Sequence, residues 1–242
     1  MTESCLFSKL SKFADLSEAD GRLLAVLEEA ERSYKKDQVV RRTGQPVDEL
    51  FVVKSGWLTS FSILEDGRRQ LLRLFYPGDI VDLSEIAQER AQHDIKCVTA
   101  ATLCPFPRSG LEPIMVRSPR LTALLFAMTV KESAVLLDRI RAIGRLSAYE
   151  RLCYLLLEIA DRLTLTVPDV GDGFRLPLTQ SDVADLLGLT NVYVSKTIAR
   201  IERDRLVRRQ GNRIILLDPE RMREICEYQN SHRIDTSWFP GV

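Results

Sequence analysis

The chain has 242 residues, enough for one large or two ordinary folded domains. Its hydrophobic content of 45% and charged content of 28% are typical of a globular protein and exclude wholesale disorder. Lysine plus arginine number 34, as do aspartate plus glutamate, so the charge of the whole chain indicates no partner.

Neither a signal peptide nor a membrane-spanning helix is predicted. The N-terminal sequence MTESCLFSKLSKF has no long apolar run, and no stretch reaches the ~18 apolar residues that a spanning helix requires. The five cysteines are scattered, odd in number and contain no CxxC pair. We therefore expect a cytoplasmic protein with reduced, mostly structural thiols.

The N-terminal part of the chain is predicted to contain helix followed by short strands. Residues from about 6 to 30 have helical periodicity, with Ser17 as a candidate N-cap. From about 33 to 108, alternating runs are separated by glycine and proline at GQP, KSG, EDGRR and YPGD. The Asp-Gly pair in EDGRR is typical of a tight hairpin turn. Several short strands with regular turns predict a small antiparallel sandwich or barrel.

Residues 118 to 143 are predicted to form one long helix, because apolar residues recur at spacings near three and four. About 25 helical residues span ~38 Å. The helix is apolar on more than one side, which favours packing against both its own domain and a second copy of itself. The alternative is a long core helix within a monomer. The residues expected at the dimer contact are Leu121, Leu125, Met128, Val135, Leu136 and Ile140.

A second helix, SAYERLCYLLLEIADRL, is predicted after Gly144, followed by the loop TVPDVGDGF. Ser147 and Glu150 form a capping box at its start. Two short helices come next, the first capped by Thr179 and ended by Gly188, which tolerates a left-handed conformation. Thr190 caps the second of these helices, which continues to about residue 204. Its inward residues are expected to be Val194, Ile198 and Ile201.

The segment LVRRQGNRIILLD predicts a hairpin with a basic tip after the two short helices. Helix, glycine turn, helix and wing together make a winged helix-turn-helix, whose second helix fits the DNA major groove. Residues 191 to 213 contain seven basic and two acidic side chains. A solvated helix face explains that charge equally well. The glycine position and the wing nevertheless favour binding of double-stranded DNA.

In this order the segments resemble the Crp/Fnr superfamily of bacterial transcription regulators. The matching motifs are FVVKSGWLTSFSILEDGRRQLL, YPGDIVDL, SAYERLCYLLLEI and, most specific, LTQSDVADLLGLTNVYVSKTIARIERDRLV. The resemblance implies an α+β fold. Residues 1–117 would form a cyclic-nucleotide-binding-like double-stranded β-helix barrel, 118–143 the dimerisation helix, and 144–242 a winged helix-turn-helix DNA-binding domain. SAYERL and LGLT place the chain nearer the Fnr side than the cAMP-receptor side.

The second short helix is the expected recognition helix. The predicted base-reading residues are Asn191, Val192, Ser195 and Lys196. The predicted phosphate-positioning residues are Thr179, Gln180, Thr190, Tyr193, Arg200, Gln210, Asn212 and Arg213. In the family pattern, Glu and Arg occupy the positions of Val192 and Lys196. We therefore expect a guanine preference opposite Lys196 and tolerance, or a thymine bias, opposite Val192.

The barrel departs from the pattern of cAMP-binding members, in which a Gly-Asp turn is followed by a Gly-Glu step and later by an Arg-Ser pair. Here Ala91 and Gln92 lie about where Arg and Ser would be, and Asp82 would repel a phosphate. On the long helix, Leu136 and Leu137 lie where polar adenine contacts are expected. We therefore expect no cAMP pocket. A weak candidate for a pocket for another ligand is Gly78, Asp82, Leu83 and Ser84.

Cofactors are not expected. An iron–sulfur cluster of the Fnr kind needs clustered N-terminal cysteines, and only Cys5 lies there, with Cys104 far along the chain. Haem ligation by His93 or Cys97 is an open alternative. His93 and His232 are the only histidines, so no metal-spaced pair, nucleophilic triad or catalytic residue is predicted.

The sequence therefore predicts a non-enzymatic, sequence-specific transcription regulator that binds a palindromic DNA site as a homodimer. Its effector would be a molecule other than cAMP, or none, and it would contact RNA polymerase if it is an activator. A cAMP-responsive or haem-based regulator is one alternative. Another is an enzyme or small-molecule-binding module whose C-terminal block binds protein.

Overall fold

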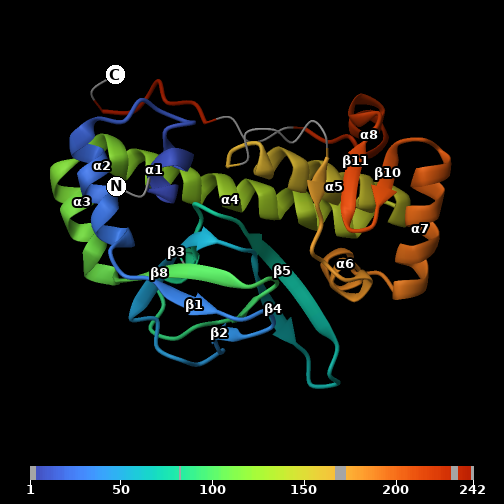
Figure 1. Cartoon of the computed structure of the whole chain (residues 1–242), viewed down its shortest axis with the longest axis horizontal. Helices are drawn as coiled ribbons and strands as arrows, with labels where there is room; N and C mark the ends of the chain where they lie inside the picture. Colours follow the sequence, from blue (N-terminus) through green and yellow to red (C-terminus); the bar gives the residue numbers. More distant parts are fainter. Residues whose placement is uncertain (1–3, 82, 167–172, 230–233, 241–242) are drawn as a thin grey trace. The chain divides into compact units, whose positions relative to one another are not determined.

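The computed structural model of the protein describes residues 4–81, 83–166, 173–229 and 234–240 (Figure 1). The predictions made for Asp82, His232 and most of the loop TVPDVGDGF lie outside the described residues. The chain divides into two compact units. The first unit contains Met1–Ser62, Leu72–Glu132 and Arg233–Val242, and the second contains Ile63–Leu71 and Ser133–His232.

Two four-stranded sheets form the β-rich part of the chain. One has the strand order β1 (Arg32–Tyr34), β8 (Ala101–Pro107), β3 (Glu49–Ser55) and β6 (Ile80–Val81). The other has the order β2 (Val39–Arg41), β7 (Asp94–Cys97), β4 (Leu58–Ile63) and β5 (Arg69–Phe75). β3 pairs antiparallel with both β6 and β8, and β7 pairs antiparallel with both β2 and β4. This arrangement confirms the predicted antiparallel β-rich domain.

Short helices cover one side of this β-structure in the first unit. They are α1 (Cys5–Leu10), α2 (Glu18–Ala25), η1 (Val26–Glu28), η2 (Leu83–Glu85), η3 (Arg108–Leu111) and α3 (Glu112–Arg117). Strand β3 is buried on both faces: Phe51 and Val53 lie in the cluster inside the β-structure, whereas Leu50 and Val52 pack in the cluster that includes the helices. A strand covered on both faces is apolar throughout, as LFVV is.

The long helix α4 (Pro119–Arg145) is two residues longer at its C-terminal end than predicted, and Gly144 lies inside it. A glycine in a helix interior costs only about 1 kcal/mol relative to alanine, so it does not by itself end a helix. Among the described helices, none is both long enough and apolar enough to cross a membrane.

The second unit contains the remaining helices and a small sheet. They are α5 (Ala148–Leu163), β9 (Phe174–Arg175), α6 (Gln180–Leu187), α7 (Asn191–Arg203), β10 (Val207–Gln210), β11 (Arg213–Leu216) and α8 (Pro219–Cys226). The capping box of Ser147 and Glu150 is present at the start of α5, as predicted. Strand β9 and helix α8 were not predicted. β9 has only two residues, and it forms because it pairs with β11.

Candidate nucleic-acid interface

Helix α6 begins with a capping box that was predicted only in part. The Thr179 hydroxyl accepts the N–H of Asp182 at 3.1 Å and donates to Asp182 Oδ2 at 2.7 Å. The backbone N–H of Thr179 also donates to Asp182 Oδ2, at 3.0 Å. Because its single hydroxyl proton is already donated, Thr179 can donate to a phosphate only by breaking the box. The helix ends at Gly188 with φ of +63°, as predicted.

Helix α7 presents all four predicted base-reading residues to solvent. Asn191, Val192, Ser195 and Lys196 are exposed, and the Val192 side chain is 62% exposed. Thr190 caps the helix by accepting the N–H of Tyr193 at 3.4 Å. The buried residues of α7 are Val194, Thr197 and Ile201. The predicted inward residue Ile198 is only half-buried, because the inward face is centred on Thr197.

Two predicted DNA-contacting residues lie in hydrogen-bond contact between the helices. The Ser195 hydroxyl of α7 donates to Gln180 Oε1 of α6 at 2.8 Å. This bond leaves the Gln180 amide NH2 group to donate elsewhere, since a glutamine amide carries two donors. The pair therefore joins a predicted phosphate contact to a predicted base contact.

Arg200, a predicted phosphate contact, is held by side chains of its own unit. Its guanidinium lies over the Tyr149 ring, 4.6 Å from the centroid, and its Nε is 3.8 Å from Asp204 Oδ2. The Tyr149 hydroxyl donates to the same Asp204 oxygen at 2.7 Å. Burial, together with this hydrogen bond, raises the pKa of Tyr149 to about 12. Arg200 can bind a phosphate only in competition with these contacts.

The wing confirms the predicted hairpin with a basic tip. Strands β10 and β11 pair antiparallel around Gly211, whose φ is +62°. Gln210, Asn212 and Arg213 are exposed near the turn, as a phosphate contact requires. With its amide oriented to satisfy both groups, Asn212 accepts from Arg175 Nε at 2.7 Å. Arg175 was missed because its two-residue strand carries no periodic signal.

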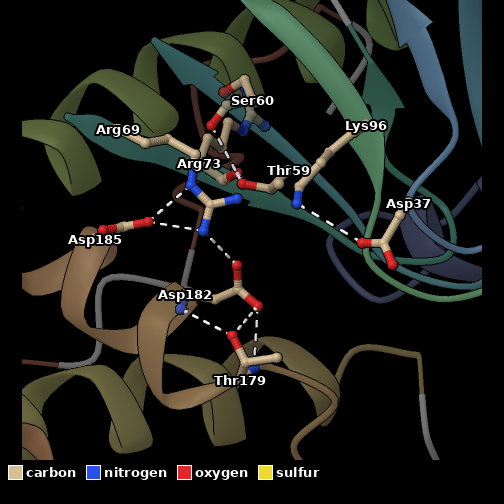
Figure 2. Close-up of polar contacts among 9 residues, drawn as sticks. All are labelled: Asp37, Thr59, Ser60, Arg69, Arg73, Lys96, Thr179, Asp182 and Asp185. Atoms are coloured by element: carbon tan, nitrogen blue, oxygen red, sulfur yellow. Dashed lines mark hydrogen bonds and ion pairs between the residues drawn. The ribbon is translucent and has the colours of Figure 1, made fainter. Parts of the chain in front are cut away.

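A second arginine missed by sequence reasoning, Arg69, contacts α6 (Figure 2). Its Nη2 donates to Asp182 Oδ1 and its Nε to Asp185 Oδ2, each at 2.7 Å. Burial opposes ionisation of Asp182. Hydrogen bonds from Thr179 and the charge of Arg69 outweigh this effect and lower the pKa of the carboxyl. Asp185 lies 116 residues from Arg69 in sequence, so no local pattern reveals the contact.

The candidate sensor pocket is poorly suited to binding a phosphate. Ser84 is exposed and Leu83 is half-buried, whereas Glu85 is buried and its Oε1 accepts the backbone N–H of Gln92 at 3.2 Å. The resemblance places a phosphate contact near Gln92, but the Gln92 N–H already donates to the Glu85 carboxylate. The Gly78 turn has φ of +79°, and a Cβ there would lie 2.8 Å from Lys9 Cβ, so the close approach of α1 requires glycine.

The described residues contain no cluster of metal-ligand side chains. No group of three or more His, Cys, Asp or Glu side chains able to hold a metal ion occurs in the described part of the chain. Burial raises the pKa of the Cys97 and Cys104 thiols to about 11, so both are protonated at neutral pH. A metal ligand must be the thiolate, which burial disfavours here.

The predicted dimer-contacting residues divide into two groups. Leu121 and Val135 are buried, and Leu125 and Met128 pack against the core of the first unit. Only Leu136 and Ile140 of the predicted set are exposed, Ile140 by 67%. Leu121, Leu125 and Met128 therefore face the core of the first unit, and Val135, which belongs to the second unit, is also buried.

Two domain families match the chain, in the order of the two regions described above. The cyclic nucleotide-binding domain family matches residues 31–118, and the Crp-like helix-turn-helix domain family matches residues 150–225. The transcriptional activator protein FnrL of Cereibacter sphaeroides is 33% identical over 211 residues, which cover 85% of this chain and 84% of FnrL. The chain belongs to the Crp/Fnr family of transcription regulators.

Other Crp/Fnr proteins support the same assignment. The nitrogen fixation regulation protein FixK of Bradyrhizobium diazoefficiens is 30% identical over 174 residues, covering 72% of each chain. The structure of FixK2 from Bradyrhizobium japonicum superposes with a TM-score of 0.73 and 27% identity, covering 81% of this chain and 96% of FixK2. Crp/Fnr regulators bind DNA, act as dimers and are not enzymes. Helix α7 lies within the part of the chain that matches the Crp-like helix-turn-helix domain.

Proposed function

We propose that this Crp/Fnr protein acts in the cytoplasm as a homodimer that reads a palindromic DNA site through α7. The exposure of Asn191, Val192, Ser195 and Lys196 on the N-terminal half of α7 is the observation that supports this proposal most strongly. In helix-turn-helix proteins, this half of the second helix reaches base edges. A two-fold dimer then predicts half-sites about one helical turn apart.

Lys196 and Val192 determine the proposed base preference. The Lys196 ammonium can donate to guanine O6 and N7, although without the rigid fork of arginine. Val192 has no polar atom in its side chain, so it can contact a thymine methyl but cannot accept from cytosine N4. We therefore expect a guanine preference opposite Lys196 and a thymine bias opposite Val192.

The phosphate contacts are proposed to surround this base-reading face. Gln180, Thr190 and Tyr193 lie at the starts of α6 and α7, where helix N-termini favour anions. Gln210, Asn212 and Arg213 lie at the wing tip. Arg175, which orients Asn212, joins this group. Thr179 and Arg200 are assigned a secondary role, because internal contacts already engage both side chains.

The proposed dimer contact is the exposed apolar stripe of α4. Phe126, Val130, Leu137 and Ile140 are all more than half exposed, and their spacings of four, seven and three fit a heptad repeat. This set leaves out the four predicted residues that are buried or pack against the core and keeps the predicted Ile140. The predicted Leu136, 44% exposed, lies next to Leu137 in the chain. A helix face with this repeat packs naturally against a copy of itself around a two-fold axis.

The barrel is proposed to act without cAMP, responding to another effector or to none. The support is chemical: Glu85 already occupies the N–H of Gln92, and a carboxylate repels a phosphate. If the protein is an activator, its further partner is RNA polymerase. Haem ligation by His93 stays an alternative, since its Nδ1 is buried without a hydrogen-bond partner among the described residues.

A DNA-binding measurement tests the proposed function. Selection from random duplexes should enrich a two-fold symmetric site, and fluorescence anisotropy should show that affinity for it falls steeply as salt rises. Poly(dI-dC) serves as the non-specific competitor. If no symmetric sequence is enriched, or if binding is insensitive to salt, the assignment of α7 to base reading is wrong.

A further inference from the structure

The segment after α8 returns to the first unit and packs in its core. Phe239 is 4% exposed and belongs to the same buried cluster as Leu6, Leu10 and Leu24, and Ile234 packs against this cluster. The segment lies beyond residue 225, where the match to the helix-turn-helix family ends. We call residues 234–240 the C-terminal tail.

Two local hydrogen bonds give the tail a defined conformation. The Ser237 N–H donates to Asp235 Oδ1 at 2.9 Å, and the Phe239 N–H donates to Thr236 O at 3.0 Å. The resulting turn directs consecutive aromatic residues to different environments. Phe239 enters the core, whereas the Trp238 side chain is 53% exposed although its ring lies only 4.7 Å from that of Phe239.

The exposed Trp238 ring contacts the exposed stripe of α4. Trp238 and Phe126 lie edge to face, with ring centroids 6.5 Å apart and an interplanar angle of 88°. Phe126 is itself 61% exposed and is the first residue of the heptad stripe that continues through Val130. The tail thus widens this stripe by one large ring.

We propose that Trp238 forms part of the dimer interface, where a second copy of the chain covers the Trp238–Phe126 pair. This inference rests on the proposed dimer and adds to it a segment outside α4. A second copy is the expected occupant because Phe126 already lies on the stripe assigned to self-association, and a two-fold axis brings equivalent patches together. Exposed aromatic residues are also typical of interface hot spots.

The four aromatic rings would bury a substantial part of the area that a stable dimer requires. Each aromatic side chain buries ~150–250 Å² when covered, and about half of each ring is still exposed here. Four rings, two from each protomer, would therefore contribute on the order of 400 Å². A stable interface buries roughly 1,200 Å² or more in total.

A single-tryptophan protein reports directly on this contact. Trp57 and Trp238 are the only tryptophans, so Trp57→Phe leaves Trp238 as the only tryptophan emitter. Dilution through the dimer dissociation constant, measured in parallel by sedimentation, should shift the emission to longer wavelength and increase quenching by acrylamide. Unchanged emission across a dilution that dissociates the dimer would overturn the proposal.

Variants of the tail provide an independent measurement. Trp238→Ala should raise the dimer dissociation constant roughly tenfold or more, and Trp238→Phe should restore most of the loss. Val26→Ala, which truncates an exposed apolar residue outside both the tail and the α4 stripe, should leave the dimer dissociation constant unchanged. Circular dichroism checks that the variants fold.

The outcomes separate the tail from the dimer itself. If the parent dimerises and Trp238→Ala dissociates no more readily than the parent, the tail is not in the interface and the proposed function is unaffected. If the parent chain sediments as a monomer at every concentration, the dimer itself is refuted, and the role of the tail with it.

Discussion

The guanidinium of Arg69 donates to the carboxylate of Asp182, with Nη2 and Oδ1 2.7 Å apart, and thereby joins the first residue of β5 to the capping box of α6. A second bond, from Nε to Asp185, binds the next turn of the same helix. Arg69 thus neutralises two carboxylates of the helix whose N-terminus carries Thr179 and Gln180. Uncompensated, those charges would repel DNA phosphates.

Replacing Arg69 should weaken both the fold of the second unit and DNA binding. Arg69→Ala leaves two partly buried carboxylates unpaired, so we expect the free energy of unfolding to fall by about 1–3 kcal/mol. Affinity should fall several-fold for all DNA sequences alike. Urea unfolding and anisotropy measure the two effects.

The neighbouring residue provides the matched control. Arg68 is 77% exposed and pairs with Asp66 within the same turn, so Arg68→Ala should change the unfolding free energy by less than about 0.5 kcal/mol. Equal effects of the two substitutions would show that the contacts of Arg69 with α6 do not contribute to stability.

Asp182 should make stability depend on acid pH. Its pKa is lower in the folded protein than in the unfolded chain, so its contribution is fully present above about pH 4 and is lost as pH falls through the folded pKa. In urea unfolding, the stability advantage of the parent over Asp182→Asn should therefore shrink below about pH 4. A pH-independent difference would contradict this.

Asp161 should make the free energy of unfolding depend on pH in the opposite direction. Burial raises its pKa, and the nearby charge of Arg223 offsets this effect only in part. Its ionised form therefore costs stability at neutral pH, and the cost disappears as pH falls towards the unfolded value of about 4. Asp161→Asn should be more stable than the parent at pH 7, and this gain should vanish near pH 3. If Asp161→Asn is less stable than the parent at both pH values, ionised Asp161 does not destabilise the fold.

The exposed stripe of α4 predicts which substitutions separate association from folding. Leu137→Glu should convert the dimer to a monomer with a native circular dichroism spectrum, because the charge is unpaired only when a partner covers it. Leu121→Glu should instead unfold the first unit, since Leu121 lies in its core. Sedimentation velocity distinguishes the two. A dimer that survives Leu137→Glu would remove α4 from the interface.

The recognition helix predicts changes in base preference. Lys196→Ala should relax the guanine preference at a cost of ~1–3 kcal/mol, while Arg213→Ala should weaken binding to all sequences about equally. Val192→Glu supplies a carboxylate that can accept from cytosine N4, so it should create a cytosine preference. Random-site selection on the parent and the three variants tests these assignments. A strict guanine–cytosine requirement of the parent at the Val192 position would refute them.

The sensor should not respond to cAMP. Because Glu85 occupies the N–H of Gln92, we expect 1 mM cAMP, roughly a thousand times a micromolar Kd, to leave the melting temperature unchanged. Calorimetry that detects micromolar binding would show that the phosphate contacts lie elsewhere in the barrel.

Local sequence was sufficient for several features whose hydrogen-bond pattern spans only a few residues. The capping box of Ser147 and Glu150, the left-handed Gly188 and the basic wing around Gly211 could all be located in this way. These features depend on backbone geometry within one turn. The family resemblance placed them in order, and so the recognition helix and its exposed residues followed.

Only the tertiary structure decided which faces are covered. Helical periodicity identifies apolar positions of α4, but it cannot show that Leu121 packs inward while Leu137 remains exposed. Arg69 meets Asp185 across 116 residues, and Phe239 enters a core built from the N-terminal helices. Packing and ion pairing act between any groups that the fold brings close. Residues distant in the sequence therefore leave no local pattern from which such contacts can be predicted.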